Sequence, residues 1–231
     1  MFLFFCQQDE NDFVHEAKMD FVDKKIMDYV IKNSEDEPEL LKELTKETYQ
    51  KILQPRMLSG HPQGRILSLL SKMIKPKRVL EIGTYTGYGT ICLAEGLAND
   101  GKIITIDKNE EIIDFQNKYF EKSGYRDKII QLHGEALNLI ETLNEKFDII
   151  FLDADKENYI EYYRSVSKKM VNGGILISDN VLWSGKVLEP SKTDDLETDI
   201  LNRFNQLLKN DTRFETIIIP IRDGVSISRL I

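Results

Sequence analysis

The chain has 231 residues, of which 41% are hydrophobic and 30% are charged, a composition typical of one globular domain with a sizeable core. Its formal net charge of −8 argues against a nucleic-acid partner, because phosphates would be repelled over most of the surface. Two cysteines, Cys6 and Cys92, make no disulfide framework, and no apolar run is long enough to cross a bilayer, so we expect a cytoplasmic protein.

The N-terminal third is predicted to be helical. Residues 1–20 show no clear period and are expected to form a loose extension to a helical segment at 21–75. Apolar residues at helical spacing predict an amphipathic helix over 21–32. A second helix is expected to begin with Asp36 as its N-cap and a proline in its first turn, and a third to cover 62–74. We expect this segment to cover the active site, to contact a second subunit, or both.

From residue 76 onward the pattern alternates between strands and helices. Continuous apolar runs such as FDIIFLDA and GGILISDN indicate strands buried on both faces, as in a parallel sheet with helices outside. Two β-rich runs near the C-terminus, separated by an Asp-Gly turn, predict an antiparallel hairpin. The fold class is therefore α/β, a doubly wound and mostly parallel sheet with helices on both faces, within one domain that spans 1–231. The predicted strands are 78–83, 102–107, 128–132, 147–153 and 174–179, followed by FETIIIPI and VSISRLI, and the predicted helices lie near 88–98, 109–122, 135–144 and 157–170.

The segment VLEIGTYTGYG, residues 79–89, joins the first predicted strand to the next helix. Its glycines let the backbone come close to a ligand, and N–H groups at the helix start can hold a carboxylate. Asp107 ends the next strand, where an acid can accept both hydroxyls of a ribose. Glu81 places a negative charge beside the turn, which disfavours a pyrophosphate and suits a ligand with an ammonium and a sulfonium. Since G-x-G-x-x-G is missing, the turn favours S-adenosylmethionine over NAD, with a plain tight connection as the alternative.

Oxygen-bearing side chains follow the fourth and fifth predicted strands. Asp153 ends the fourth strand, and Asp179 and Asn180 end the fifth. Two carboxylates and an amide oxygen make an oxygen-only set that suits Mg²⁺, with Ca²⁺ and Mn²⁺ as alternatives. The other interpretation is that such residues start turns or cap helices, which is how we interpret Asp155.

In their order and spacing, EIGTYTGYG, TIDKNEE, FLDADKENY and SDNVLWSG resemble the cation-dependent O-methyltransferases of the caffeoyl-CoA and catechol type, over about residues 25–231. The resemblance implies a Rossmann-like class I methyltransferase fold, usually homodimeric. It implies methyl transfer from S-adenosylmethionine to one hydroxyl of a catechol-like small molecule, free or as a coenzyme A ester. It also implies that Asp153, Asp179 and Asn180 hold the cation, and that Lys156 is the general base of a catalytic group that includes Asp153 and Asn180.

The same resemblance implies a set of cofactor-binding positions. Met57 and Ser59 match positions that touch the methionine end of the cofactor, and Ala136 matches a backbone amide near the adenine. Trp183 follows the predicted cation ligands and is a candidate for packing on the aromatic acceptor. Ordinary core packing is the alternative for Met57 and Trp183. The full predicted set is Met57, Ser59, Glu81, Gly83, Tyr85, Gly87, Gly89, Asp107, Ala136 and Asp153.

The chain departs from the family pattern at two positions. Gln63 stands where the family often has an acid, and Gly89 replaces a frequent serine that would bond the cofactor carboxylate. Residues 184–196 are interpreted as a mobile loop that helps to select the acceptor, with Lys186 and Lys192 available for coenzyme A phosphates. A nicotinamide-dependent oxidoreductase, a metal-independent methyltransferase and a non-catalytic binding module remain as alternatives.

Overall fold

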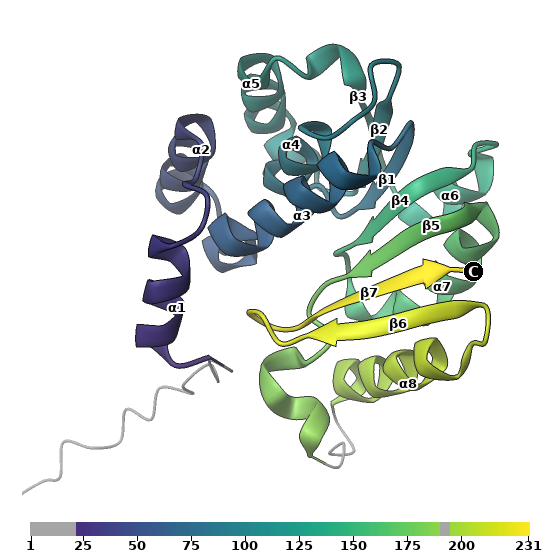
Figure 1. The fold of residues 1–231 in the computed structure, drawn as a ribbon. Coiled ribbons are helices and arrows are strands. Elements are labelled where there is room, and N and C mark those ends of the chain that lie inside the picture. The colour runs from purple at the N-terminus through teal and green to yellow at the C-terminus, as the bar shows by residue number, and fades with distance from the viewer. Residues whose placement is uncertain (1–21, 190–194) are drawn as a thin grey trace, which may run out of the picture.

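The structure, a computed structural model that describes residues 22–189 and 195–231, is built on a seven-stranded sheet with the order β3-β2-β1-β4-β5-β7-β6 (Figure 1). Strands β1 to β5 pair in parallel, while β7 runs antiparallel to both β5 and β6. The mostly parallel sheet and its C-terminal hairpin are therefore confirmed. The strands are β1 (Arg78–Ile82), β2 (Lys102–Asp107), β3 (Ile129–His133), β4 (Phe147–Leu152), β5 (Met170–Ser178), β6 (Phe214–Ile219) and β7 (Val225–Leu230).

Helices cover both faces of the sheet, as predicted (Figure 1). Because side chains alternate along a strand, Leu80 and Ile82 of β1 pack toward α6, α7 and α8, whereas Val79 packs toward α2, α3, α4 and α5. The helices are α1 (Lys24–Lys32), α2 (Glu39–Lys51), α3 (Gly60–Ile74), α4 (Tyr88–Ala94), α5 (Ile113–Ser123), α6 (Ala136–Thr142), α7 (Tyr159–Val166) and α8 (Leu196–Asn210). Short 3₁₀ helices are η1 (Pro55–Met57), η2 (Glu110–Ile112), η3 (Arg126–Lys128), η4 (Lys156–Asn158), η5 (Ser167–Lys169) and η6 (Trp183–Leu188).

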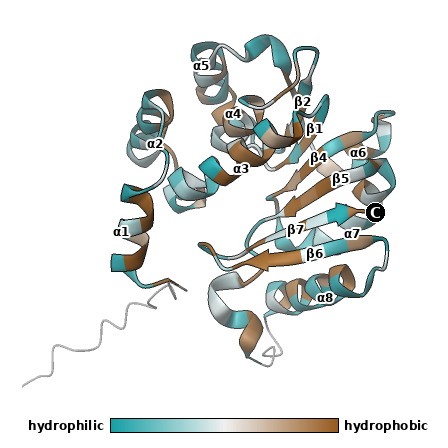
Figure 2. Ribbon diagram, viewed as in Figure 1, coloured by the Kyte–Doolittle hydropathy of each residue, from teal (hydrophilic) through white to brown (hydrophobic). Residues whose placement is uncertain are grey.

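The central strands are apolar on both faces because each face carries its own hydrophobic core. Figure 2 shows β4 and β5 as largely hydrophobic. Cys92 of α4 is fully buried, whereas Cys6 lies outside the described residues. No helix in the described part of the chain is both long and apolar enough to span a membrane.

Three predictions about the helices need correction. The first helix begins at Lys24, not at residue 21, and none of its residues is buried, so the described part of the chain leaves its apolar side uncovered. Asp36 does not cap α2: Pro38 occupies the N-cap position with an extended backbone, and Glu37, which precedes the proline, is disfavoured in the helical region, so α2 begins only at Glu39.

The third correction concerns the predicted loop at 184–196. Its first part forms η6, which continues the turn after β5. The backbone N–H groups of Val181 and Leu182 donate to the carbonyls of Gly224 and Asp223, so the β6–β7 turn holds this segment from the side. Residues 190–194, with Lys192, and the predicted extension at 1–20 lie outside the described residues.

Candidate functional site

The predicted cation ligands come from two adjacent strand ends. Leu152 of β4 is in register with Ser178 of β5, so Asp153 and Asp179 leave the sheet side by side. The ladder continues for one residue, because the Asp179 backbone N–H donates to the Leu152 carbonyl at 3.0 Å. β4 and β5 are therefore neighbours, and both acids lie at the same edge of the sheet.

Asp179 is a buried carboxylate with short contacts to neutral donors. The Gln63 side-chain nitrogen donates to Oδ2 at 2.8 Å, and the Asn180 backbone N–H donates to Oδ1 at 2.8 Å. Burial, and secondly the negative charge of Asp153, raise the pKa of Asp179 to about 6, although Lys156 acts in the opposite direction. The pair therefore concentrates negative charge in a place from which water is largely excluded.

Lys156 lies in η4 against this pair, and its side chain is buried. Its ammonium nitrogen lies 2.8 Å from the Tyr159 hydroxyl and 3.3 Å from Asp153 Oδ1. Tyr159, also buried, donates in turn to the backbone carbonyl of Asp179 at 2.9 Å. Tyr159 was missed by the sequence reasoning, although it closes the motif FLDADKENY and follows Lys156 by three positions. Asp155 holds the N-cap position of η4, but its side chain makes no capping hydrogen bond and its carboxylate accepts instead from the side chains of Asn158 and Tyr162.

These residues fit a small, hard divalent cation. Among the described residues there is no group of three or more His, Cys, Asp or Glu side chains that could hold a metal, so a site here depends on the amide of Asn180 as well as on the two acids. Asn180 has a left-handed backbone (φ 58°), a conformation that asparagine tolerates better than most residues. The donor set is oxygen-only, and it carries excess negative charge in a buried setting, which is the chemistry that Mg²⁺ prefers.

The glycine turn after β1 lies directly against the acid at the end of β4. Gly83 has a φ of +103°, and a Cβ built there would come within 1.9 Å of the Asp153 carbonyl oxygen, so only glycine fits. A small pocket opens at this turn. Seven of the predicted cofactor-binding residues line it: Met57, Ser59, Glu81, Gly83, Tyr85, Gly89 and Asp153. Residues that are far apart in the sequence therefore share one pocket.

Glu81 is buried on the face of the sheet that α4 covers. Its Oε2 accepts hydrogen bonds from the hydroxyls of Thr90 and Thr105. Burial, only partly offset by these bonds, raises the pKa of Glu81 to about 8. A Cβ at Gly89 would lie 2.7 Å from Glu81 Oε1, so the serine that the family often has would crowd this carboxylate. The departure at Gly89 therefore leaves room beside the acid.

Three of the predicted positions are not among the residues that line the pocket: Gly87, Asp107 and Ala136. Asp107 ends β2 and accepts hydrogen bonds from the backbone N–H groups of Tyr85 at 2.6 Å and Asn109 at 2.9 Å. Gly87 is the N-cap of α4, and Ala136 is the first residue of α6. Asp107 thus supports the glycine turn through the Tyr85 backbone, in addition to its predicted role in binding the ribose.

Met57 and Trp183 were each given core packing as an alternative. Met57 is 55% exposed and lines the pocket, so core packing is wrong for this residue. Trp183 is half-buried and packs against the core on the α8 side, which agrees with a packing role. Its indole nitrogen is buried, and no hydrogen-bond partner for it lies within the described residues.

Arg222, in the β6–β7 turn, also belongs to this region and was not singled out from the sequence. Its guanidinium donates to the backbone carbonyl of Ser59, 163 residues away. It therefore ties the loop that carries two predicted cofactor-binding residues to the turn beside Asp179. Nothing in the local pattern around position 222 signals this contact.

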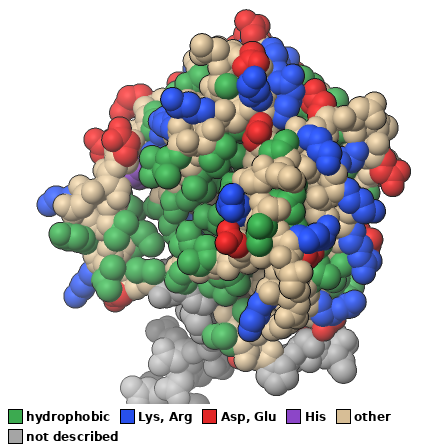
Figure 3. Space-filling model, turned by 45° about the vertical axis from the view of Figure 1, so that its right-hand side comes forward, with side chains coloured by type: hydrophobic (Ala, Val, Ile, Leu, Met, Phe, Trp, Pro, Cys, Tyr) green, Lys and Arg blue, Asp and Glu red, His purple; other side chains and the backbone are tan. Residues whose placement is uncertain are grey.

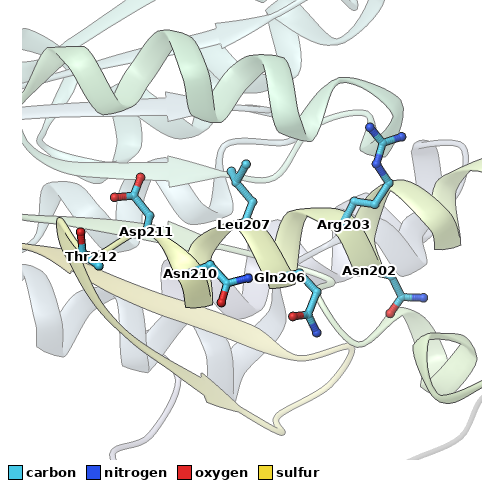
Figure 4. A pocket seen from close by; sticks show the side chains of 7 residues that line it. All are labelled: Asn202, Arg203, Gln206, Leu207, Asn210, Asp211 and Thr212. Carbon is cyan, nitrogen blue, oxygen red and sulfur yellow. The ribbon is translucent and has the colours of Figure 1, made fainter.

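A second, wider hollow runs along α8 at some distance from these residues (Figure 4). It is open to solvent, and six of the seven side chains that line it are polar or charged, three of them amides. One of them, Asp211, is engaged by Arg213 at 2.6 Å, and this ion pair holds the pKa of the acid well below its usual range. The hollow contains none of the predicted site residues, and we assign it no role.

Comparison with known proteins gives a consistent result. The sequence profile of a family described as O-methyltransferase matches residues 31–231. The caffeoyl-CoA O-methyltransferase of Petroselinum crispum is 35% identical over 206 residues, which cover 84% of this chain and 85% of that protein. The sequence match thus covers most of both proteins.

Solved structures agree with the sequence comparison. The S-adenosylhomocysteine-bound methyltransferase of Podospora anserina superposes with a TM-score of 0.81 at 29% identity, covering 90% of this chain and 94% of that one. The O-methyltransferase of Bacillus cereus, solved with S-adenosylhomocysteine, has a TM-score of 0.82 at 27% identity, covering 90% and 97%. The family match over residues 31–231 includes the strands whose ends carry the pocket and the acid pair.

Proposed function

The chain belongs to the O-methyltransferase family, and from this premise we propose that it transfers a methyl group from S-adenosylmethionine to one hydroxyl of a small catechol-like acceptor, with a divalent cation, Mg²⁺ in the first place. The observation that carries the proposal is the meeting of three parts at one sheet edge. The glycine turn touches Asp153, Asp153 neighbours Asp179 in the sheet, and Lys156 lies 3.3 Å from Asp153. Family membership removes the nicotinamide-dependent alternative.

In this proposal Asp153, Asp179 and Asn180 hold the cation, and Lys156 acts as the general base. When bound, the cofactor supplies a methyl group on a sulfonium and the cation supplies a positive charge for the acceptor oxygens. Lys156 takes the proton of the acceptor hydroxyl at Nζ, which Tyr159 holds in place at 2.8 Å. Burial of these groups keeps water away from the proton that moves.

The cofactor end of the site is assigned to the pocket at the glycine turn. Glu81 is the acid available for the ammonium of the cofactor, and Gly89 leaves space beside its Oε1. Asp107, at the end of β2, is assigned to the ribose hydroxyls, and Ala136 to the adenine. The exposed face of Met57 is available to the methionine end of the cofactor.

The acceptor is proposed as a vicinal dihydroxy-aromatic molecule, because two neighbouring oxygens can bind one cation together. The Petroselinum crispum relative is named for caffeoyl-CoA, so a coenzyme A ester is a candidate. Lys186, suggested for its phosphates, forms an ion pair with Asp195 at 3.4 Å and is otherwise exposed. Trp183 stays a candidate contact for the aromatic ring.

The test is methyl transfer from labelled S-adenosylmethionine to caffeic acid and to its coenzyme A ester, in Mg²⁺ and in EDTA. Asp179→Ala is expected to abolish transfer, as chelation does. Asp155→Ala is the matched control: it removes a nearby acid whose carboxylate is engaged by Asn158 and Tyr162, and it is expected to retain activity. Transfer that survives both EDTA and Asp179→Ala would instead identify a metal-independent methyltransferase.

A homodimer is part of the same proposal. None of the residues of α1 is buried, and Ile26 and Tyr29 are 57% and 69% exposed, so an apolar helix face is available to a second copy. Figure 3 shows further hydrophobic side chains gathered over this face of the molecule. Light scattering after size exclusion is expected to give a dimer, and Tyr29→Asp is expected to weaken it. Tyr49→Asp, at a comparably exposed tyrosine of α2, is the control; a wild-type monomer would refute the dimer.

A further inference from the structure

Gln63 of α3 makes a buried contact across the fold. It is only 1% exposed, and its side-chain nitrogen donates to Asp179 Oδ2 at 2.8 Å although the two residues are 116 positions apart. An ionised carboxylate can only accept hydrogen bonds, so the amide must present its nitrogen to Asp179. The other polar atom, Oε1, is buried and has no partner among the described residues.

This arrangement gives Asp179 a hydrogen-bond donor but leaves the Gln63 amide oxygen unpaired among the described residues. Leaving a buried amide oxygen unpaired is unfavourable, and the opposite amide orientation would place two acceptors against each other. Gln116 offers a comparison, because it is equally buried and both ends of its amide are bonded: it donates to Tyr85 at 2.7 Å and accepts from Gln131 at 3.1 Å. The orientation of Gln63 is thus set by the carboxylate alone.

A neutral donor has a particular effect on a carboxylate that binds a cation. It restricts the rotation of the carboxylate without neutralising its charge, whereas a lysine or arginine in this place would compete with the cation. Each Asp179 oxygen accepts one hydrogen bond, from Gln63 or from the Asn180 backbone, and keeps a second lone pair. The unpaired Oε1 of Gln63 is in addition an acceptor suited to a water molecule of a hydrated cation.

We propose that Gln63 is a positioning residue of the cation site, which holds Asp179 in the orientation that binds the cation while leaving its negative charge intact. The inference rests on the cation site in the proposed function and adds a residue that lies outside its ligand set. Groups that orient metal ligands typically change metal affinity by roughly 10–100-fold when they are removed. Gln63 is expected to act within this range.

The experiment measures Mg²⁺ and Mn²⁺ binding to the full chain by titration calorimetry, with neither cofactor nor acceptor present. Gln63→Met keeps the length of the side chain and removes the donor, and Gln116→Met makes the same change at the comparison site. We expect Gln63→Met to weaken binding about 10-fold or more, and Gln116→Met to leave the dissociation constant within about two-fold. Urea unfolding of each variant without metal reports whether it is folded.

Three results would overturn the inference. Equal metal affinity of wild type and Gln63→Met would show that the contact does not position Asp179. Equal weakening by both methionine variants would show a general loosening of the core. Absence of cation binding in the wild type would remove the cation from the proposed function itself, and is distinguished by the wild-type titration alone. If Gln63→Met does not fold, Gln63→Asn, whose amide is one methylene too short to reach Asp179, is expected to show the same weakening.

Discussion

Glu81→Gln isolates the effect of the buried acid beside the glycine turn. Burial raises the pKa of Glu81 from 4.5 to about 8, so between these values the folded protein keeps a proton that the unfolded chain releases. The stability of the folded state is then complete below the unfolded pKa and is lost as the pH rises toward 8. A glutamine at position 81 keeps the shape and does not titrate, so this pH dependence is expected to disappear.

The size of the effect follows from the two pKa values of Glu81. One pH unit between pH 4.5 and 8 lowers the unfolding free energy by about 1.4 kcal/mol, because unfolding releases one proton. From pH 6 to pH 8 the wild type is therefore expected to lose about 2 kcal/mol relative to Glu81→Gln, since the acid is partly ionised at the upper end. A cofactor ammonium would favour the ionised form, so cofactor binding is expected to tighten over the same range in the wild type only.

The assay is urea unfolding of both proteins at pH 6, 7 and 8, with cofactor affinity measured by calorimetry at the same pH values. The difference in unfolding free energy between wild type and variant, followed over pH, cancels the contributions of all other groups. A difference that stays constant within about 0.5 kcal/mol from pH 6 to pH 8 would refute the reasoning that burial keeps Glu81 protonated. A cofactor affinity that changes with pH in the same way in wild type and in Glu81→Gln would show that Glu81 does not bind the ammonium.

Three further substitutions test the framework of the site. Gly83→Ala is expected to cost more than about 3 kcal/mol, because the new methyl would overlap the Asp153 carbonyl at a left-handed backbone position; a melting temperature within two degrees or so of the wild type would contradict this. Tyr159→Phe removes the hydroxyl that holds Lys156, and is expected to lower kcat at least about ten-fold with little change in the KM for the cofactor; a changed KM with unchanged kcat would contradict the assignment. Phe204→Ala removes a fully buried ring that packs edge-on against Tyr159, with 5.2 Å between the ring centroids. It is expected to lower the free energy of unfolding by about 3–5 kcal/mol, and a decrease below about 1 kcal/mol would contradict the packing.

The architecture of the sheet was predictable because its signals are local. Continuous apolar runs such as that of β4 indicate burial on both faces, and the Asp-Gly turn before β7 indicates a hairpin. Helix ends were less predictable. The start of α2 depended on the geometry of Pro38 and not on the better capping side chain two residues earlier. The segment after Asn180 forms η6 because the β6–β7 turn supports it, which the local composition does not reveal.

Much of the candidate site could also be predicted, since parallel strands deliver their last residues to the same edge. That rule alone brings Asp153 and Asp179 together, and it places Asp107 beside the glycine turn. It says nothing about the helices that pack over the edge. Gln63 and Tyr159 bond to the site from such helices, and although Tyr159 closes the motif FLDADKENY, neither residue's contact follows from the strand rule.

The sequence by itself determined the fold class, the family and the strand ends that carry the acids, because hydrophobic period and motif order are properties of short segments. Tertiary structure decided how these groups behave. Burial raises the pKa of Glu81, encloses Lys156 and turns the Gln63 amide toward Asp179, and each of these effects depends on side chains from distant parts of the chain. Desolvation and hydrogen-bond partnership are set by what surrounds a group in space, which no local pattern in the sequence encodes.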